Sequence, residues 1–148
     1  MSDYIIRIIP GDPFCCIPGE ELCRLAGHLG SMIKADKIKA VTYEAPAFID
    51  CGSNLEKIEC PLCGSLLDFD WWGEAMSAAA ENEFSDLSVS LPCCGGKSSL
   101  NDLRYDFPCG FACAEISILN PPDEPGEECL RYIRDRFGTA VRVIRSHM

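Results

Sequence analysis

The chain has 148 residues, 47% of them hydrophobic, which predicts one folded domain with room for a sizeable insertion and excludes a globally disordered polymer. Its 23 acidic and 13 basic residues give a formal charge of −10, which opposes binding to the phosphates of a nucleic-acid duplex. The sequence contains no run of about 18 apolar residues, so it predicts no transmembrane helix. The first residues lack the pattern of a secretion signal, and we therefore expect a cytoplasmic protein.

The first predicted unit is a strand, a helix and a second strand. Residues 4–9 are rich in isoleucine and end at Pro10, which cannot donate to a sheet ladder. Residues 18–21 (Pro-Gly-Glu-Glu) place a proline and two glutamates where a helix start favours them. Residues 38–43 predict the second strand. The helix between the strands shows an apolar stripe at Leu22, Leu25, Ala26, Leu29 and Ile33.

The same order of elements returns near the end of the sequence. Residues 114–119 predict a strand that is closed by Pro121, and residues 125–128 repeat Pro-Gly-Glu-Glu. A helix follows with Leu130, Ile133 and Phe137 on one face and Gly138 as its stop, and then a strand over residues 139–145.

Two β-α-β units predict an α+β protein, a ferredoxin-like split β-α-β sandwich with strand order 4-1-3-2 and both helices on one face of the sheet. Residues 1–45 and 111–148 would form this discontinuous domain. Residues 46–110 would form a zinc-ribbon-like insertion between strands 2 and 3. Strand alternation places four side chains on the face away from the helices: Arg7, Glu115, Ser117 and Arg142.

The insertion has predicted elements of its own. Residues 66–69 predict a short strand, and Asp70 is the expected N-cap of a helix that reaches Phe84. This helix carries a stripe typical of a core-facing helix, at Trp72, Met76, Ala79, Ala80 and Phe84. Residues 87–91 alternate as a half-buried strand does.

Eleven cysteines are many for this length, and in a reducing compartment they indicate metal ligands or buried thiols. The strongest local motif is Cys60-Pro-Leu-Cys63-Gly64, because two thiolates three positions apart can face one ion, as in zinc ribbons. A redox pair is the alternative, but that motif normally opens a helix. Here a strand-like run follows Gly64, which favours a metal site.

Zinc in a structural site needs four ligands, and Cys93 with Cys94 supplies the second pair, 29 residues beyond Cys63. Adjacent side chains diverge in extended chain, so one ligand could instead come from another cysteine. The candidates for that ligand are Cys51, Cys109 and Cys113. The motif does not separate zinc from iron, and buried thiols are the alternative reading of Cys93 and Cys94.

Residues 60–64 (CPLCG), 70–72 (DWW), 92–95 (PCCG) and 99–103 (SLNDL) resemble an uncharacterised family of small bacterial proteins. The resemblance implies a zinc-ribbon-like element and no assigned activity. Its pattern does not require cysteine at positions 109 and 113. It therefore favours Cys60, Cys63, Cys93 and Cys94 as the ligands of a structural Zn²⁺.

The sequence favours a zinc-stabilised protein-binding or regulatory module over two other functions. No basic residue lies between Lys57 and Lys97, so the insertion would present an acidic surface to another protein of basic character, such as a toxin or a nucleic-acid-binding factor. A small metal- or thiol-dependent enzyme is the alternative, but only two histidines and no nucleotide-binding or Ser-His-Asp motif support it. A nucleic-acid-binding zinc ribbon ranks third because the insertion is acidic, and the oligomeric state is not predicted.

Overall fold

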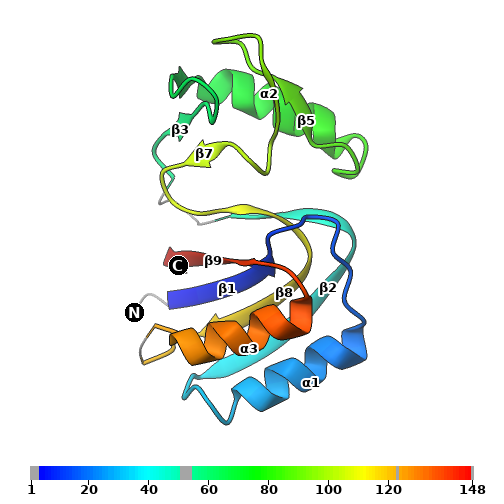
Figure 1. Cartoon of the computed structure of the whole chain (residues 1–148), viewed down its shortest axis with the longest axis vertical. Helices are drawn as coiled ribbons and strands as arrows, with labels where there is room; N and C mark the ends of the chain where they lie inside the picture. Colours follow the sequence, from blue (N-terminus) through cyan, green and yellow to red (C-terminus); the bar gives the residue numbers. More distant parts are fainter. Residues whose placement is uncertain (1–3, 51–54, 123, 148) are drawn as a thin grey trace.

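The computed structural model describes residues 4–50, 55–122 and 124–147, and over these residues the chain is a mixed α+β protein with three helices and antiparallel sheets (Figure 1). The α+β prediction is confirmed. None of the described helices has the length and apolar character to cross a lipid bilayer. The elements are β1 (Tyr4–Pro10), α1 (Gly19–Leu29), β2 (Lys37–Ile49), β3 (Ile58–Glu59), β4 (Leu66–Leu67), α2 (Phe69–Ala80), β5 (Ser88–Ser90), β6 (Lys97–Ser99), β7 (Arg104–Tyr105), β8 (Gly110–Leu119), α3 (Glu127–Phe137) and β9 (Val141–His147).

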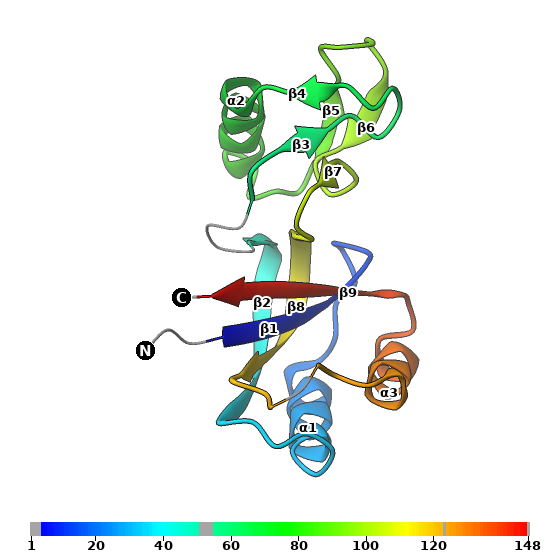
Figure 2. The same cartoon turned by 90° about the vertical axis from the view of Figure 1, so that its left-hand side faces the viewer.

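The largest sheet contains four antiparallel strands in the order β2-β8-β1-β9. Read from the other edge, the order is β9-β1-β8-β2, which is the predicted order 4-1-3-2 of the four main strands. The expectation that residues 5–9 and 116–119 are neighbours is confirmed, since Ile8 pairs with Ile116 and Ile6 pairs with Ile118. Figure 2 shows α1 and α3 at one end of the molecule and α2 with its short strands at the other, with the four-stranded sheet between them.

Helices α1 and α3 bury their apolar stripes against one face of this sheet. Ile6, Ile8 and Ile116 lie in one buried cluster with Leu22 of α1 and Ile133 of α3. Each fully buried side chain of this size stabilises the fold by about 1.5–3 kcal/mol relative to exposure. The apolar stripes of α1 and α3 and the even-numbered residues of β1 and β8 therefore form one core.

The opposite face carries the polar side chains that alternation predicts. Arg7 pairs with Ser117, and its Nε lies 3.7 Å from a carboxylate oxygen of Glu115. Ile9, two residues along β1 from Arg7, pairs with Arg142. Because directly paired residues project from the same side of a sheet, these side chains share the face away from the helices.

Three predicted helix boundaries differ from the structure, and one is confirmed. Helix α1 ends at Leu29, so Ile33 reaches the core from the following loop. The N-cap of α2 is Asp68, not Asp70, and its carboxylate accepts a hydrogen bond from the Asp70 N–H at 2.8 Å. Helix α2 ends at Ala80, before Phe84. Helix α3 stops at Gly138 as predicted, and the φ of 74° there suits glycine.

Strands β2 and β8 extend beyond their predicted ends. Ala47 pairs with Ala112 and Ile49 pairs with Gly110, after a shift in register between Thr42 and Ala47. The segment that leaves the sheet is therefore residues 50–109, and the expected insertion at residues 46–110 includes the last four residues of β2. We call residues 50–109 the insert and the remaining chain the body.

The insert docks on the body through a buried side-chain amide. Asn101 is 4% exposed; its Oδ1 accepts hydrogen bonds from the Phe111 N–H at 2.9 Å and from Arg142 Nη1 at 3.2 Å. Its Nδ2 donates to the carbonyl of Gly11 at 3.2 Å. A Cβ on Gly110 would collide with the Arg142 guanidinium and with Asn101 Oδ1, so a larger residue here would have to displace these side chains.

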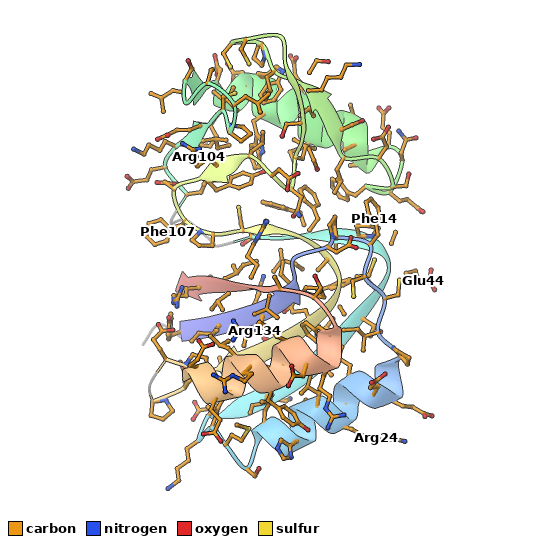
Figure 3. All side chains as sticks on the ribbon, viewed as in Figure 1. Phe14, Arg24, Glu44, Arg104, Phe107 and Arg134 are labelled. Atoms are coloured by element: carbon orange, nitrogen blue, oxygen red, sulfur yellow. The ribbon has the colours of Figure 1, made fainter. Side chains whose placement is uncertain are left out.

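The connection from β7 to β8 passes from the surface into the core. In Figure 3, Arg104 marks β7 on the insert side, and Phe107 projects from the connection between β7 and β8. Phe107 is exposed, whereas Cys109, two residues on, is buried, and its carbonyl accepts from Arg142 Nη1 at 2.8 Å. Arg142 thus binds both Asn101 and the backbone just before β8.

We predict that Asn101→Ala lowers the free energy of unfolding by roughly 2–4 kcal/mol, because the Phe111 N–H and the Gly11 carbonyl lose a buried partner. Urea denaturation of the metal-loaded protein measures the change. The exposed Asn82 is the matched control, and Asn82→Ala should stay within about 0.5 kcal/mol of the parent. Equal stability of the two variants would contradict the docking role.

Candidate metal centre

Two short antiparallel hairpins of the insert carry the four predicted ligands in their turns. The first hairpin pairs β3 with β4, where Glu59 faces Leu66. The second pairs β5 with β6, where Ser90 faces Lys97. In each hairpin six residues separate the strands, and the cysteines lie among them. The hairpins therefore present their thiols from the ends of two short ladders.

The turn of the first hairpin is closed by two backbone hydrogen bonds. The Cys60 N–H donates to the carbonyl of Ser65 at 2.8 Å, and the Gly64 N–H donates to the carbonyl of Cys60 at 3.0 Å. Gly64 has a φ of 78°, in the left-handed region that favours glycine. This geometry returns the chain sharply enough to bring Cys60 and Cys63 to one side.

The turn of the second hairpin repeats the same hydrogen bonds without the same cysteine spacing. The Leu91 N–H donates to the carbonyl of Gly96 at 2.8 Å, and the Gly95 N–H donates to the carbonyl of Leu91 at 2.9 Å. Gly95 has a φ of 72°. The two turns therefore have one backbone design, with proline second and glycine fifth in each.

This equivalence shows how adjacent cysteines can serve one site. Counted from the residue that opens each turn, Cys60 and Cys63 are first and fourth, whereas Cys93 and Cys94 are third and fourth. Leu91 occupies the first position and is buried in the core of the insert. The divergence expected of neighbouring side chains applies to extended chain and is avoided in this tight turn.

The four sulfur atoms lie within 4.8 Å of one another. Cys60 Sγ is 3.9 Å from Cys94 Sγ, and Cys63 Sγ is 3.3 Å from Cys93 Sγ, so each close contact joins the two hairpins. A tetrahedron with metal–sulfur bonds of about 2.3 Å has sulfur–sulfur edges of about 3.8 Å. The cluster is therefore of the size needed to hold a metal ion.

Hydrogen bonds around the sulfurs favour thiolates on the first hairpin. Burial acts to raise the pKa of Cys60, but the N–H groups of Cys63 and Leu62, each 3.4 Å from its sulfur, outweigh it and lower that pKa. Hydrogen bonds with the hydroxyl and N–H of Ser65 lower the pKa of Cys63 to about 6. Burial and hydrogen bonds with the neighbouring sulfurs raise the pKa of Cys93 to about 12, so its thiol holds a proton that a cation would displace.

The other candidate ligands lie elsewhere or outside the described residues. Cys109 is buried in a cluster with Ile9, and the Cys113 thiol donates to the Pro13 carbonyl at 3.4 Å. Cys51 falls outside the residues that the structure describes. The structure therefore brings together the four cysteines that the sequence analysis selected. The described cysteines of the body outside β8 are Cys15, Cys16, Cys23 and Cys129.

Sequence reasoning missed Ser65 as a partner of the Cys63 sulfur. Ser65 Oγ lies 3.3 Å from Cys63 Sγ. A signal was available, because Pro and Gly at the second and fifth positions of both six-residue turns indicate that the turns are equivalent. Aligning the two turns gives Ser65 and Gly96 the same sixth position, so only the first turn carries a hydroxyl there.

An all-sulfur site limits the chemistry that a bound ion can perform. Cys60 is buried, whereas Cys63, Cys93 and Cys94 are exposed, so an ion reaches the site from solvent. Four thiolates would complete a tetrahedral shell and leave no position for a water or substrate. The arrangement therefore suits a structural ion rather than a hydrolytic one.

No protein-family model, curated protein or solved structure matches the chain. The resemblance to a family of small bacterial proteins therefore stays a prediction. The geometry and chemistry of the four sulfurs carry the functional argument instead.

We predict that one equivalent of zinc protects Cys63, Cys93 and Cys94 of the reduced protein from alkylation, because coordinated thiolates are no longer free nucleophiles. Peptide mapping after N-ethylmaleimide treatment measures the labelling of each cysteine. Cys16 and Cys23 are exposed and lie outside the quartet, so they serve as internal controls and should label equally with and without zinc. Protection that extends equally to Cys16 and Cys23 would count against a defined site.

Proposed function

We propose that Cys60, Cys63, Cys93 and Cys94 bind one structural zinc ion. The observation that carries this proposal is the sulfur cluster, whose close contacts of 3.3 and 3.9 Å bracket the edge of a zinc–thiolate tetrahedron. Zinc suits the set because it accepts four thiolates in tetrahedral geometry without redox chemistry. The two turns of identical backbone design support a zinc ribbon as the architecture of this part of the insert.

We further propose that the body is a ferredoxin-like split β-α-β sandwich and that the zinc-ribbon-like insert interrupts it between β2 and β8. The strand order and the single helical layer support this assignment. Under this proposal the body supplies a rigid base, and the insert is the part specialised for recognition.

The proposed ion gives the insert a stability that its own sheets do not provide. Strands β3 to β7 are two or three residues long, and the insert holds eleven of the 23 acidic residues but only three of the 13 basic ones. Repulsion among these carboxylates opposes compaction. Closing the loop from Cys63 to Cys93 through an ion removes disorder from the unfolded chain and offsets that repulsion.

The protein then acts in the cytoplasm as a zinc-stabilised binding or regulatory module that presents an acidic surface to a basic protein. The supporting surface is the outer side of α2, where Asp70, Glu74 and Glu81 surround a shallow depression. Gly73 and Ser77 also line this depression, and such small residues let a partner side chain approach the backbone. The field of the carboxylates would speed and orient the encounter with a cationic partner.

We predict that the purified protein carries about one zinc per chain and that Cys60→Ser releases it, because Cys60 is the buried ligand whose loss leaves three sulfurs. Elemental analysis by mass spectrometry measures the ratio. Cys109→Ser is the matched control, a buried cysteine outside the cluster, and should retain the ion. Zinc lost from Cys109→Ser but retained in Cys93→Ser/Cys94→Ser would reject this ligand set.

Cobalt substitution gives a second readout of the same site. Four thiolates around Co²⁺ produce sulfur-to-metal charge-transfer absorption, which should appear in the parent and in Cys109→Ser but not in Cys60→Ser. A protein purified without chelator or acid that holds no zinc and gives no such band would contradict the structural-zinc proposal.

We predict that replacing the α2 carboxylates removes the basic partner. Affinity capture from the native cell extract, followed by mass spectrometry, should lose basic proteins when Asp70→Asn, Glu74→Gln and Glu81→Gln are combined. Their recovery should also fall as salt rises from about 0.05 to 0.3 M, because exposed charge pairs are screened. Glu20→Gln, Glu21→Gln and Glu128→Gln in the body form a control of equal charge change. Identical captured proteins from both variants would rule out α2 as the binding surface.

A further inference from the structure

The sheet face away from the helices carries a basic row in a protein of strongly acidic composition. Strand register places Lys39 of β2 opposite Ser117 of β8, and Ser117 opposite Arg7 of β1. The next row along the same strands is Lys37, Leu119 and Ile5. Side chains that are directly paired project from one face and lie about 5 Å apart at Cβ, so the two rows form one patch.

A small pocket opens on this patch. It has a volume of about 120 Å³ and is lined by Ile5, Lys37, Lys39, Ser117 and Leu119. Lys37, Lys39 and Ser117 are the lining residues that carry hydrogen-bond donors, and Ile5 and Leu119 supply apolar walls. A volume this small is far below the several hundred Å³ of a cofactor or drug-sized site. The pocket therefore suits one compact polar group with an apolar attachment.

Arg7 adds positive charge to the first row of the patch, and one of its donors is unused. Its Nε is buried and has no hydrogen-bond partner within the described part of the chain. Glu115 lies 3.7 Å from this nitrogen and is also held by the Tyr43 hydroxyl at 2.9 Å. Glu115 balances Arg7, whereas Lys37 and Lys39 form no salt bridge with any residue that the structure describes. The patch therefore keeps two uncompensated positive charges.

We propose that this pocket binds the phosphate group of a small phosphomonoester. Lys37 and Lys39 would contact the phosphate oxygens, and the Ser117 hydroxyl would donate a hydrogen bond between them. Ile5 and Leu119 would pack against the organic part of the molecule. The site belongs to the body, so it is independent of the metal centre and of the acidic surface on α2, and it adds a ligand class to the proposed function.

The charges of the molecule favour a small phosphate ester over a polynucleotide. The positive patch spans two rows of the sheet, whereas duplex or single-strand binding needs a longer basic track with aromatic platforms. The insert, with a net charge of −8 from its eleven acidic and three basic residues, would repel the rest of a long polyanion. A single phosphate avoids most of this repulsion, because salt at about 0.1 M screens charges that lie more than about 10 Å away.

Nuclear magnetic resonance of the ¹⁵N-labelled, zinc-loaded full chain tests the proposal. The probes are inorganic phosphate and phenyl phosphate, added at constant ionic strength in a phosphate-free buffer. We expect saturable shifts of the amides of Lys37, Lys39 and Ser117 with both probes, and tighter binding of phenyl phosphate because of its apolar ring. No saturable shift at these amides, or stronger binding of an oligothymidylate than of phenyl phosphate, would overturn it.

Variants separate a built site from general attraction of anions. Lys39→Ala and Ser117→Ala should each weaken phenyl phosphate binding about tenfold, as loss of a charge-assisted hydrogen bond does. Lys34→Ala removes the same charge outside the pocket and should change the affinity less than about twofold. An equal loss in Lys34→Ala and Lys39→Ala would overturn the proposal. The ¹⁵N spectrum of each variant reports directly whether its fold is intact.

Discussion

The hydrogen bonds between Asn101 and Arg142 join parts of the chain that are far apart in the sequence. Asn101 comes from the insert and Arg142 from β9, and the same two side chains hold Gly11 and the carbonyl of Cys109. Three segments therefore meet at one buried polar cluster. Since an unpartnered amide or guanidinium is costly in such a place, the cluster fixes one orientation of the insert on the body.

The candidate metal centre and this polar cluster lie at different places in the insert and would order different parts of it. The cluster holds the end of the insert that faces the body, where Leu103, Phe111 and Phe84 also pack. With an ion bound, the four sulfurs would hold the hairpin turns, where the strands are too short to define a shape by themselves. An acidic surface between two fixed ends can keep a constant arrangement of charges, and recognition by charge depends on that constancy.

Sequence periodicity was enough to predict the body but not how the insert attaches to it. The isoleucine-rich β1, the repeated Pro-Gly-Glu-Glu segments and Gly138 follow local rules, and the structure agrees with them. The end of β2 was missed because the register shift between Thr42 and Ala47 breaks the alternation. Asp68 and Asp70 are equally good caps in sequence, so only the backbone decides between them. Asn101 belongs to no pattern, because its partners come from distant segments.

The four cysteines could be chosen from the sequence because the residues that form a tight turn are local in the chain. The geometry of the site could not be predicted, because Cys93 and Cys94 do not occupy the same turn positions as Cys60 and Cys63. The basic row on the sheet depends on register across three strands, which one sequence does not specify.

The pairing of Ile49 with Gly110 places the two ends of the insert directly opposite each other in adjacent strands. A tight hairpin of a few residues could join β2 to β8 at this point without moving any other strand. The insert could therefore be removed at this point while the strand order of the body is kept. In a chain shortened in this way, the Arg142 guanidinium would lose Asn101 as a partner.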